Sequence, residues 1–101
     1  MRIQLLYFAG CPHYEPTLEL LRRTADERDQ ELDIELVEVS NNDDARRLRF
    51  LGSPTLQVNG VDIEPTAAAR NDFALSCRVY GASGTPPREL IEVALIRGNG
   101  S

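Results

Sequence analysis

The sequence predicts an α/β protein whose four-stranded mixed sheet has the order 2-1-3-4 and carries helices on both faces. Residues 3–8 form an apolar run with one polar member, which is typical of a strand covered on both sides. An amphipathic segment and a second strand-like stretch, residues 33–39, follow, and such a β-α-β unit makes its two strands parallel. Asn59-Gly60 separates two short alternating runs and indicates an antiparallel hairpin.

Proline and capping residues set the expected bounds of the helices. The first helix is expected over about residues 12–28, and Pro16 fits its first turn but not its interior. Its regular part therefore begins only near residue 15 and leaves Cys11 on the loop before it. A second, short helix is expected over residues 43–51, with two candidates for its N-terminal cap, Asn41 and Asn42.

The last third of the chain is harder to assign. Residues 64–72 are Ala-rich and ambiguous after Glu64-Pro65, and residues 73–80 suit either an added strand or an ordered loop. In a strand, one side would carry Phe73, Leu75, Cys77 and Val79. A final helix begins at residues 85–87, its apolar face being Leu90, Ile91, Ala94 and Leu95. We expect one domain over residues 1–101, with a frayed tail from residue 97.

Composition excludes several classes of function. The formal net charge of −5 argues against nucleic acid or an anionic membrane as partner. All 11 basic residues are arginine, so no lysine nucleophile exists. No apolar run approaches the ~20 residues of a membrane helix, and the apolar start reads as a buried strand, which predicts a cytoplasmic protein. Two cysteines and one histidine argue against a structural zinc site, and no metal ligand is predicted.

Two motifs carry a resemblance to the thioredoxin/glutaredoxin superfamily: a cysteine directly after the first strand, and Gly-Ser-Pro-Thr directly before the hairpin. The likeness covers residues 1–63 and the final helix, whereas residues 64–84 exceed what the minimal fold needs. A narrower likeness, to small bacterial thioredoxin-family proteins, rests on Gly10-Cys11-Pro12-His13-Tyr14, Phe50-Leu51-Gly52-Ser53-Pro54-Thr55, Glu64-Pro65, Ser76-Cys77-Arg78-Val79-Tyr80 and Gly84-Thr85-Pro86-Pro87. The resemblance implies a thioredoxin-like fold.

The superfamily's Cys-x-x-Cys site corresponds here to Cys11-Pro12-His13-Tyr14, so tyrosine replaces the second cysteine. A dithiol cycle needs a nearby second thiol, which leaves monothiol, glutaredoxin-like chemistry open. The helix N-terminus, and His13 when protonated, would favour the reactive thiolate of Cys11. The alternatives are a small buried hydrophobe for Cys11, a solvated loop residue for His13, and helix packing for Tyr14.

Around Pro54 the resemblance implies a cis Ser53-Pro54 bond that faces the cysteine loop. In relatives the backbone of the residue before this proline pairs with an extended substrate peptide, a role that would fall to Ser53; the alternative is a simple turn residue. The residues expected to contact substrate are Pro12, Tyr14, Ser53, Pro54 and Thr55.

Cys77 and its neighbours leave several roles open. Cys77 can resolve Cys11, share a soft metal ion with it, or fill the core. Arg70 and Arg78 can bind an anionic substrate such as glutathione, although an arginine is ordinarily solvated.

Two functions follow. The first is a monothiol thiol-disulfide oxidoreductase that uses Cys11, needs no bound cofactor and takes glutathione or another thiol as co-substrate. Its partners are protein or small-molecule thiols and disulfides. The second is a non-catalytic binding or sensing module that holds a partner or a soft metal through Cys11 and Cys77. The sequence does not indicate an oligomeric state.

Overall fold

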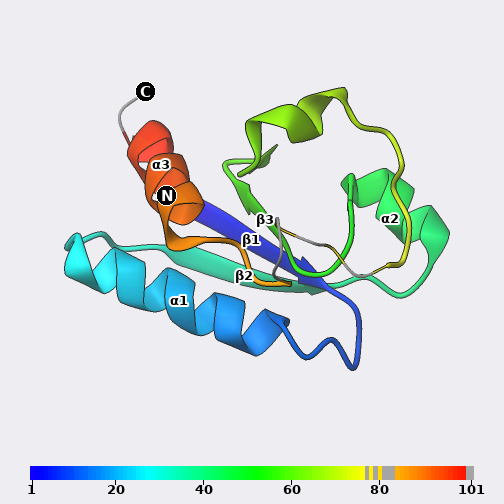
Figure 1. The fold of residues 1–101 in the computed structure, drawn as a ribbon, viewed down its shortest axis with the longest axis horizontal. Coiled ribbons are helices and arrows are strands. Elements are labelled where there is room, and N and C mark those ends of the chain that lie inside the picture. The colour runs from blue at the N-terminus through cyan, green and yellow to red at the C-terminus, as the bar shows by residue number, and fades with distance from the viewer. Residues whose placement is uncertain (77, 79, 81–83, 100–101) are drawn as a thin grey trace.

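The computed structural model describes residues 1–76, 78, 80 and 84–99, which contain one mixed sheet in the order β2-β1-β3-β4 (Figure 1). The strands are β1 (Arg2–Tyr7), β2 (Asp33–Glu38), β3 (Thr55–Val58) and β4 (Val61–Asp62). β1 pairs in parallel with β2, whereas β3 is antiparallel to both β1 and β4. The predicted α/β class, mixed four-stranded sheet and strand order are confirmed.

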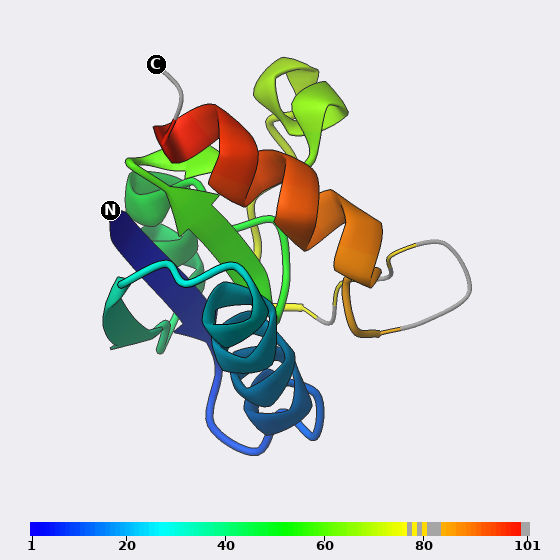
Figure 2. The same ribbon diagram turned by 90° about the vertical axis from the view of Figure 1, so that its left-hand side faces the viewer.

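Helices lie on both faces of the sheet, as predicted (Figures 1 and 2). They are α1 (Tyr14–Glu27), α2 (Asn42–Leu48), the 3₁₀ helix η1 (Pro65–Ala69) and α3 (Arg88–Asn99). The face under α1 and α3 holds the larger core, which includes Ile3, Leu5, Leu21, Leu56, Ile91 and Leu95. The opposite face holds a smaller cluster beside α2, made of Leu6, Val39, Ala45 and Phe50. β1 contributes to both clusters, which explains its continuous apolar run.

The short helix α2 is limited at both ends by identifiable residues. The Asn41 side chain caps it by accepting a hydrogen bond from the backbone N–H of Asp44 at 2.8 Å. At the other end Arg49 adopts the left-handed conformation, with φ of 57°. The helix therefore stops at Leu48, earlier than the predicted residue 51, and Phe50 is free to enter the core, where it is fully buried.

The hairpin forms at the predicted turn. Asn59 and Gly60 both have positive φ, 52° and 85°, the pattern of a type I′ turn whose twist matches that of the two strands. β4 ends at Asp62, one residue earlier than expected.

The C-terminal helix is longer than the sequence predicts. We expected fraying from Arg97, and α3 instead continues through Asn99. Gly98 explains the close packing of this end: a Cβ built there would lie 2.7 Å from Cγ1 of Val58, so only glycine lets the helix approach β3 so closely. Among the residues that the structure describes, no helix is long and apolar enough to cross a membrane.

The segment 73–80 forms no extended strand in its described part. The predicted inward-facing side is wrong for Leu75, which is 40% exposed. Arg78 and Tyr80, on the opposite parity, are buried instead, at 3% and 5% exposed. Cys77 and Val79 lie outside the described residues. We call the described residues of this segment, Phe73–Ser76, Arg78 and Tyr80, the strap.

Candidate functional site

Cys11 lies on the loop that joins β1 to α1, as predicted, and we call residues 8–13 the cysteine loop. The loop turns through Gly10, whose φ is +90°, and the backbone N–H of Cys11 donates to the carbonyl of Phe8 at 3.2 Å. Cys11 is a free thiol two residues before His13, the N-cap of α1. The residue is only 5% exposed, in line with the alternative interpretation of Cys11 as a small buried residue.

His13 occupies the N-cap position but does not cap the helix through its side chain. Its carbonyl accepts from both the backbone and the hydroxyl of Thr17, at 3.2 and 2.7 Å. The imidazole lies against the backbone of Gly84, because a Cβ built there would be 2.6 Å from Nε2. The segment that leads into α3 therefore lies beside the cysteine loop, and the absence of a side chain at Gly84 leaves space for the His13 imidazole.

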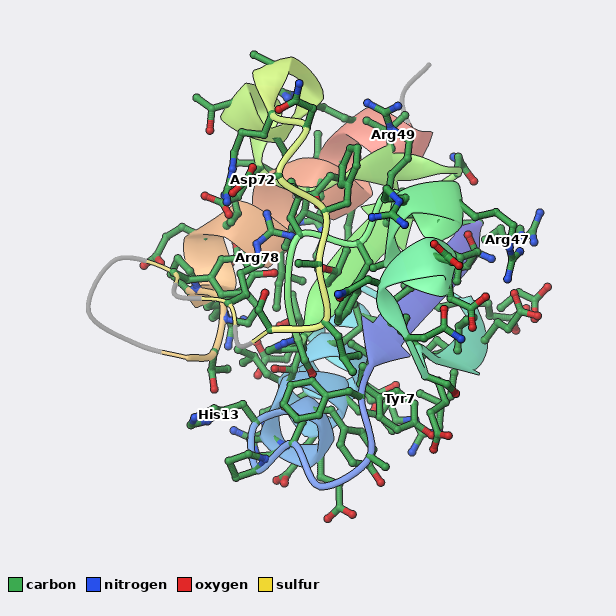
Figure 3. All side chains as sticks on the ribbon, turned by 90° about the vertical axis from the view of Figure 1, so that its right-hand side faces the viewer. Tyr7, His13, Arg47, Arg49, Asp72 and Arg78 are labelled. Atoms are coloured by element: carbon green, nitrogen blue, oxygen red, sulfur yellow. The ribbon has the colours of Figure 1, made fainter. Side chains whose placement is uncertain are left out.

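Tyr14, in the position of the missing second cysteine, packs on β1. Its ring stacks on that of Tyr7, with centroids 4.3 Å apart and planes at 17°. The phenol donates to Glu15 Oε1 at 3.2 Å, and this hydrogen bond raises the pKa of Tyr14 above its ordinary value. Figure 3 shows Tyr7 and His13 on opposite sides of the β1–α1 loop. The Tyr14 ring therefore has a packing role, which is the alternative that the sequence left open for it. Pro12, on the same loop as Cys11, is exposed.

The second loop of the site, residues 52–55, lies beside the first. The Ser53-Pro54 bond is cis, as predicted. Ser53 is fully buried, and its hydroxyl accepts a hydrogen bond from the backbone N–H of Phe8 at 3.4 Å. Ser53 thereby contacts the start of the cysteine loop. The hydroxyl of Thr55, also fully buried, donates to the carbonyl of Gly52 at 2.6 Å, which makes Thr55 a structural part of the loop.

The backbone of Ser53 is already paired with the strap. Its N–H donates to the carbonyl of Ser76 at 2.8 Å, and its carbonyl accepts from the N–H of Arg78 at 2.9 Å. The strap also contacts the next residue of the loop, since the Tyr80 hydroxyl donates to the carbonyl of Pro54 at 2.6 Å. Both backbone groups that the resemblance assigned to a substrate peptide are therefore occupied by this chain's own residues.

Arg78 anchors this pairing from the interior, and the expectation of a solvated arginine is wrong. All five of its N–H groups are used: Asp62 accepts two bonds at 2.7 and 2.9 Å, Glu64 two at 2.6 and 3.2 Å, and Thr55 one at 3.2 Å. The guanidinium also lies 4.7 Å from the centre of the Tyr80 ring. Arg78 has no donor left for an anionic substrate.

The electrostatics of this cluster follow from its burial. Burial opposes the charge of Arg78, but the bonds to Asp62 and Glu64 outweigh it, so the pKa of the guanidinium is raised. For the Tyr80 phenol, burial itself raises the pKa, because it disfavours the charged phenolate. Asp62 and Glu64 are not among the site residues predicted from the sequence. A signal was available, because two carboxylates with i, i+2 spacing at the end of a predicted strand share one side.

The other predicted residues are placed as follows. Arg70 is exposed and paired with Asp72 at 2.7 Å, and Figure 3 shows Asp72 far from His13 of the cysteine loop. Cys77 lies outside the described residues, so its proposed roles as resolving thiol, metal ligand or core residue have no geometry here. Within residues 1–76, 78, 80 and 84–99, no group of three His, Cys, Asp or Glu side chains is placed to hold a metal ion.

Comparison of the chain with known proteins finds no matching family model, no matching curated protein and no matching solved structure.

Proposed function

We propose that the chain is a thioredoxin-like domain that acts as a monothiol thiol-disulfide oxidoreductase through Cys11. One observation carries the proposal: a free cysteine lies on the β1–α1 loop, just before the helix N-terminus. The 52–55 loop lies beside it, because the Ser53 hydroxyl accepts a hydrogen bond from the backbone N–H of Phe8, at the start of the β1–α1 loop. The predicted strand order and the cis Ser53-Pro54 bond agree with the resemblance on which the proposal rests.

The proposed reaction is a two-step exchange. The Cys11 thiolate attacks the glutathione sulfur of a mixed disulfide, forming a Cys11–glutathione disulfide and releasing the substrate thiolate, which takes up a proton. A second glutathione then attacks this disulfide as its thiolate, releasing oxidised glutathione and regenerating Cys11. The net reaction reduces one mixed disulfide at the expense of one thiol, and no resolving cysteine is needed. His13, on the same loop, is the proposed proton donor to the leaving thiolate.

The proposed setting is the cytoplasm, where glutathione keeps thiols reduced. The test is glutathione-coupled reduction of a small mixed disulfide, followed through glutathione reductase and NADPH. Cys11→Ser should abolish turnover. Cys77→Ser is the matched control, and it should retain activity within about twofold of the wild type if an external thiol completes the cycle. Full activity of folded Cys11→Ser would overturn the proposal.

The burial of Cys11 favours a second candidate, a non-catalytic module that holds a soft metal ion through Cys11 and Cys77. Equilibrium dialysis with Hg²⁺ distinguishes the two functions. The binding module predicts one tightly held ion per chain, lost in either cysteine variant, together with no turnover in the coupled assay.

A further inference from the structure

The feature that the proposed function leaves unused is the strap and the charge cluster that holds it. We infer that the strap closes the Ser53 backbone to extended polypeptides, so that the substrates of Cys11 are low-molecular-weight disulfides. This inference rests on the proposed function and specifies its substrate class.

An extended peptide that docks by strand addition needs a free N–H and a free carbonyl on its acceptor. Ser53 contacts the cysteine loop directly, through its hydroxyl and Phe8, and a peptide paired with its backbone would pass beside that loop. The strap already satisfies both groups, at 2.8 and 2.9 Å. A polypeptide could bind there only after the strap has left.

The strap is fixed along its length. Its backbone N–H groups donate from Ala74 to the carbonyl of Phe50 at 3.3 Å and from Leu75 to the Asn42 side chain at 2.8 Å. The Tyr80 hydroxyl adds the bond to the 52–55 loop. The strap is thus attached to α2, to the segment after α2 and to the Ser53 loop.

Arg78 is the positioning residue of the strap. Its side chain is 2% exposed, and its carboxylate partners Asp62 and Glu64 are 12% and 29% exposed. Because Arg78 belongs to the strap, lifting the strap would pull its guanidinium away from Asp62 and Glu64 and break four charge-assisted hydrogen bonds at once. Gly52 adds to the fit, because a Cβ there would lie 2.9 Å from Cβ of Arg78. The structure therefore favours the closed strap strongly.

The first experiment uses the wild-type chain and three substrates in the glutathione-coupled assay. They are the mixed disulfide of glutathione with 2-mercaptoethanol, a glutathionylated unstructured peptide, and the same peptide with N-methylated amides beside its cysteine. N-methylation removes the donors that strand addition would use. We expect kcat/KM for the peptide to be unchanged, within about twofold, by N-methylation, and to lie below that for the small disulfide. A peptide that donated a backbone hydrogen bond to the Ser53 carbonyl would lose on the order of tenfold on N-methylation, and that result overturns the inference.

The second experiment releases the strap. Arg78→Met keeps the length of the side chain and leaves its former carboxylate partners able to reach water. Arg70→Met is the matched control, since Arg70 has an exposed ion pair of its own. Arg78→Met should raise kcat/KM for the peptide on the order of tenfold, in a manner sensitive to N-methylation, and change the small disulfide by less than about twofold. Arg70→Met should behave as the wild type.

The outcomes separate the two claims. A folded Arg78→Met variant that gains nothing on the peptide shows that the strap does not exclude it, and overturns the inference alone. If Arg78→Met does not fold, the N-methylation comparison in the wild type still decides. Wild-type chain that turns over neither the small disulfide nor the peptide overturns the proposed function.

Discussion

Replacing Asp62 with asparagine tests whether the Arg78 cluster holds the fold together. Asp62 accepts two bonds from Arg78, at 2.7 and 2.9 Å, and both side chains are largely buried. Removing one partner of a buried ion pair costs about 3–5 kcal/mol, since the other charge is left without compensation. Glu64 still pairs with the guanidinium, which places the expected loss near the lower end, about 3 kcal/mol.

The matched control is Asp72→Asn. Asp72 also pairs with an arginine at 2.7 Å, but the side chains of Arg70 and Asp72 are 44% and 65% exposed. Exposed pairs of this kind contribute little to stability, because water and salt screen them. The same chemical change at two arginine-carboxylate pairs is therefore expected to differ several-fold in its effect on the free energy of unfolding.

Urea unfolding followed by circular dichroism measures both variants. A loss of about 3 kcal/mol in a chain of this size also lowers Tm by about 12 °C or more, and it removes a large part of a typical domain's stability. Asp72→Asn should lower Tm by only a few degrees. Equal losses in the two variants, within about 0.5 kcal/mol, would refute the assignment of Arg78 as a buried anchor.

Three further predictions concern the core, the 52–55 loop and Tyr14, which follows the cysteine loop. Phe50→Ala should cost about 3–5 kcal/mol in urea unfolding, because it empties a fully buried site beside α2; a loss below about 1 kcal/mol would contradict this packing. Gly52→Ala should destabilise the fold by about 1 kcal/mol or more, since φ is +119° and the new Cβ meets Arg78; a neutral thermal scan would contradict it. Glu15→Gln should lower the pKa of Tyr14 toward its ordinary value, because the carboxylate that accepts the phenol proton is lost; a spectrophotometric titration, assigned with Tyr14→Phe, would contradict this if the pKa stayed unchanged.

The sheet was predictable because its signals are local or pairwise. The apolar run of β1 contributes to two cores, and Asn59-Gly60 has the two positive φ values that a hairpin turn needs. Asn41 caps α2 through a bond to a residue three positions away. Each of these features depends on neighbours in sequence or on a short loop. The cis Ser53-Pro54 bond came from the resemblance to a family and not from local chemistry.

The strap was not predictable because its determinants are distant in sequence. Arg78 finds its carboxylate partners 14 and 16 positions away, and an arginine in an alternating segment ordinarily faces water. The apolar alternation of the segment places Leu75 on the side that faces the core. Instead, Arg78 and Tyr80 on the other side are buried, and Leu75 is exposed. The burial of Cys11, which is 5% exposed, could not be predicted from its loop position alone, because that position does not show which other segments pack around it.

The extent of α3 shows a third kind of limit. Arg97-Gly98-Asn99 has the composition of a frayed end, but α3 continues through Asn99, and Gly98 lets this end of the helix lie close to Val58. Glycine lowers intrinsic helix propensity, and here the tertiary packing outweighs that cost.

Trapping the disulfide between Cys11 and glutathione tests whether Cys11 is the nucleophile. The folded chain is treated with an excess of the mixed disulfide of glutathione and 2-mercaptoethanol, quenched with acid and digested, and each cysteine peptide is examined by mass spectrometry. We expect one glutathione on Cys11, which disappears when reduced glutathione is added, and none on this peptide in Cys11→Ser. A Cys11 peptide that stays unmodified in the folded chain, while the urea-unfolded chain is modified there, would contradict the assignment of Cys11 as the nucleophile.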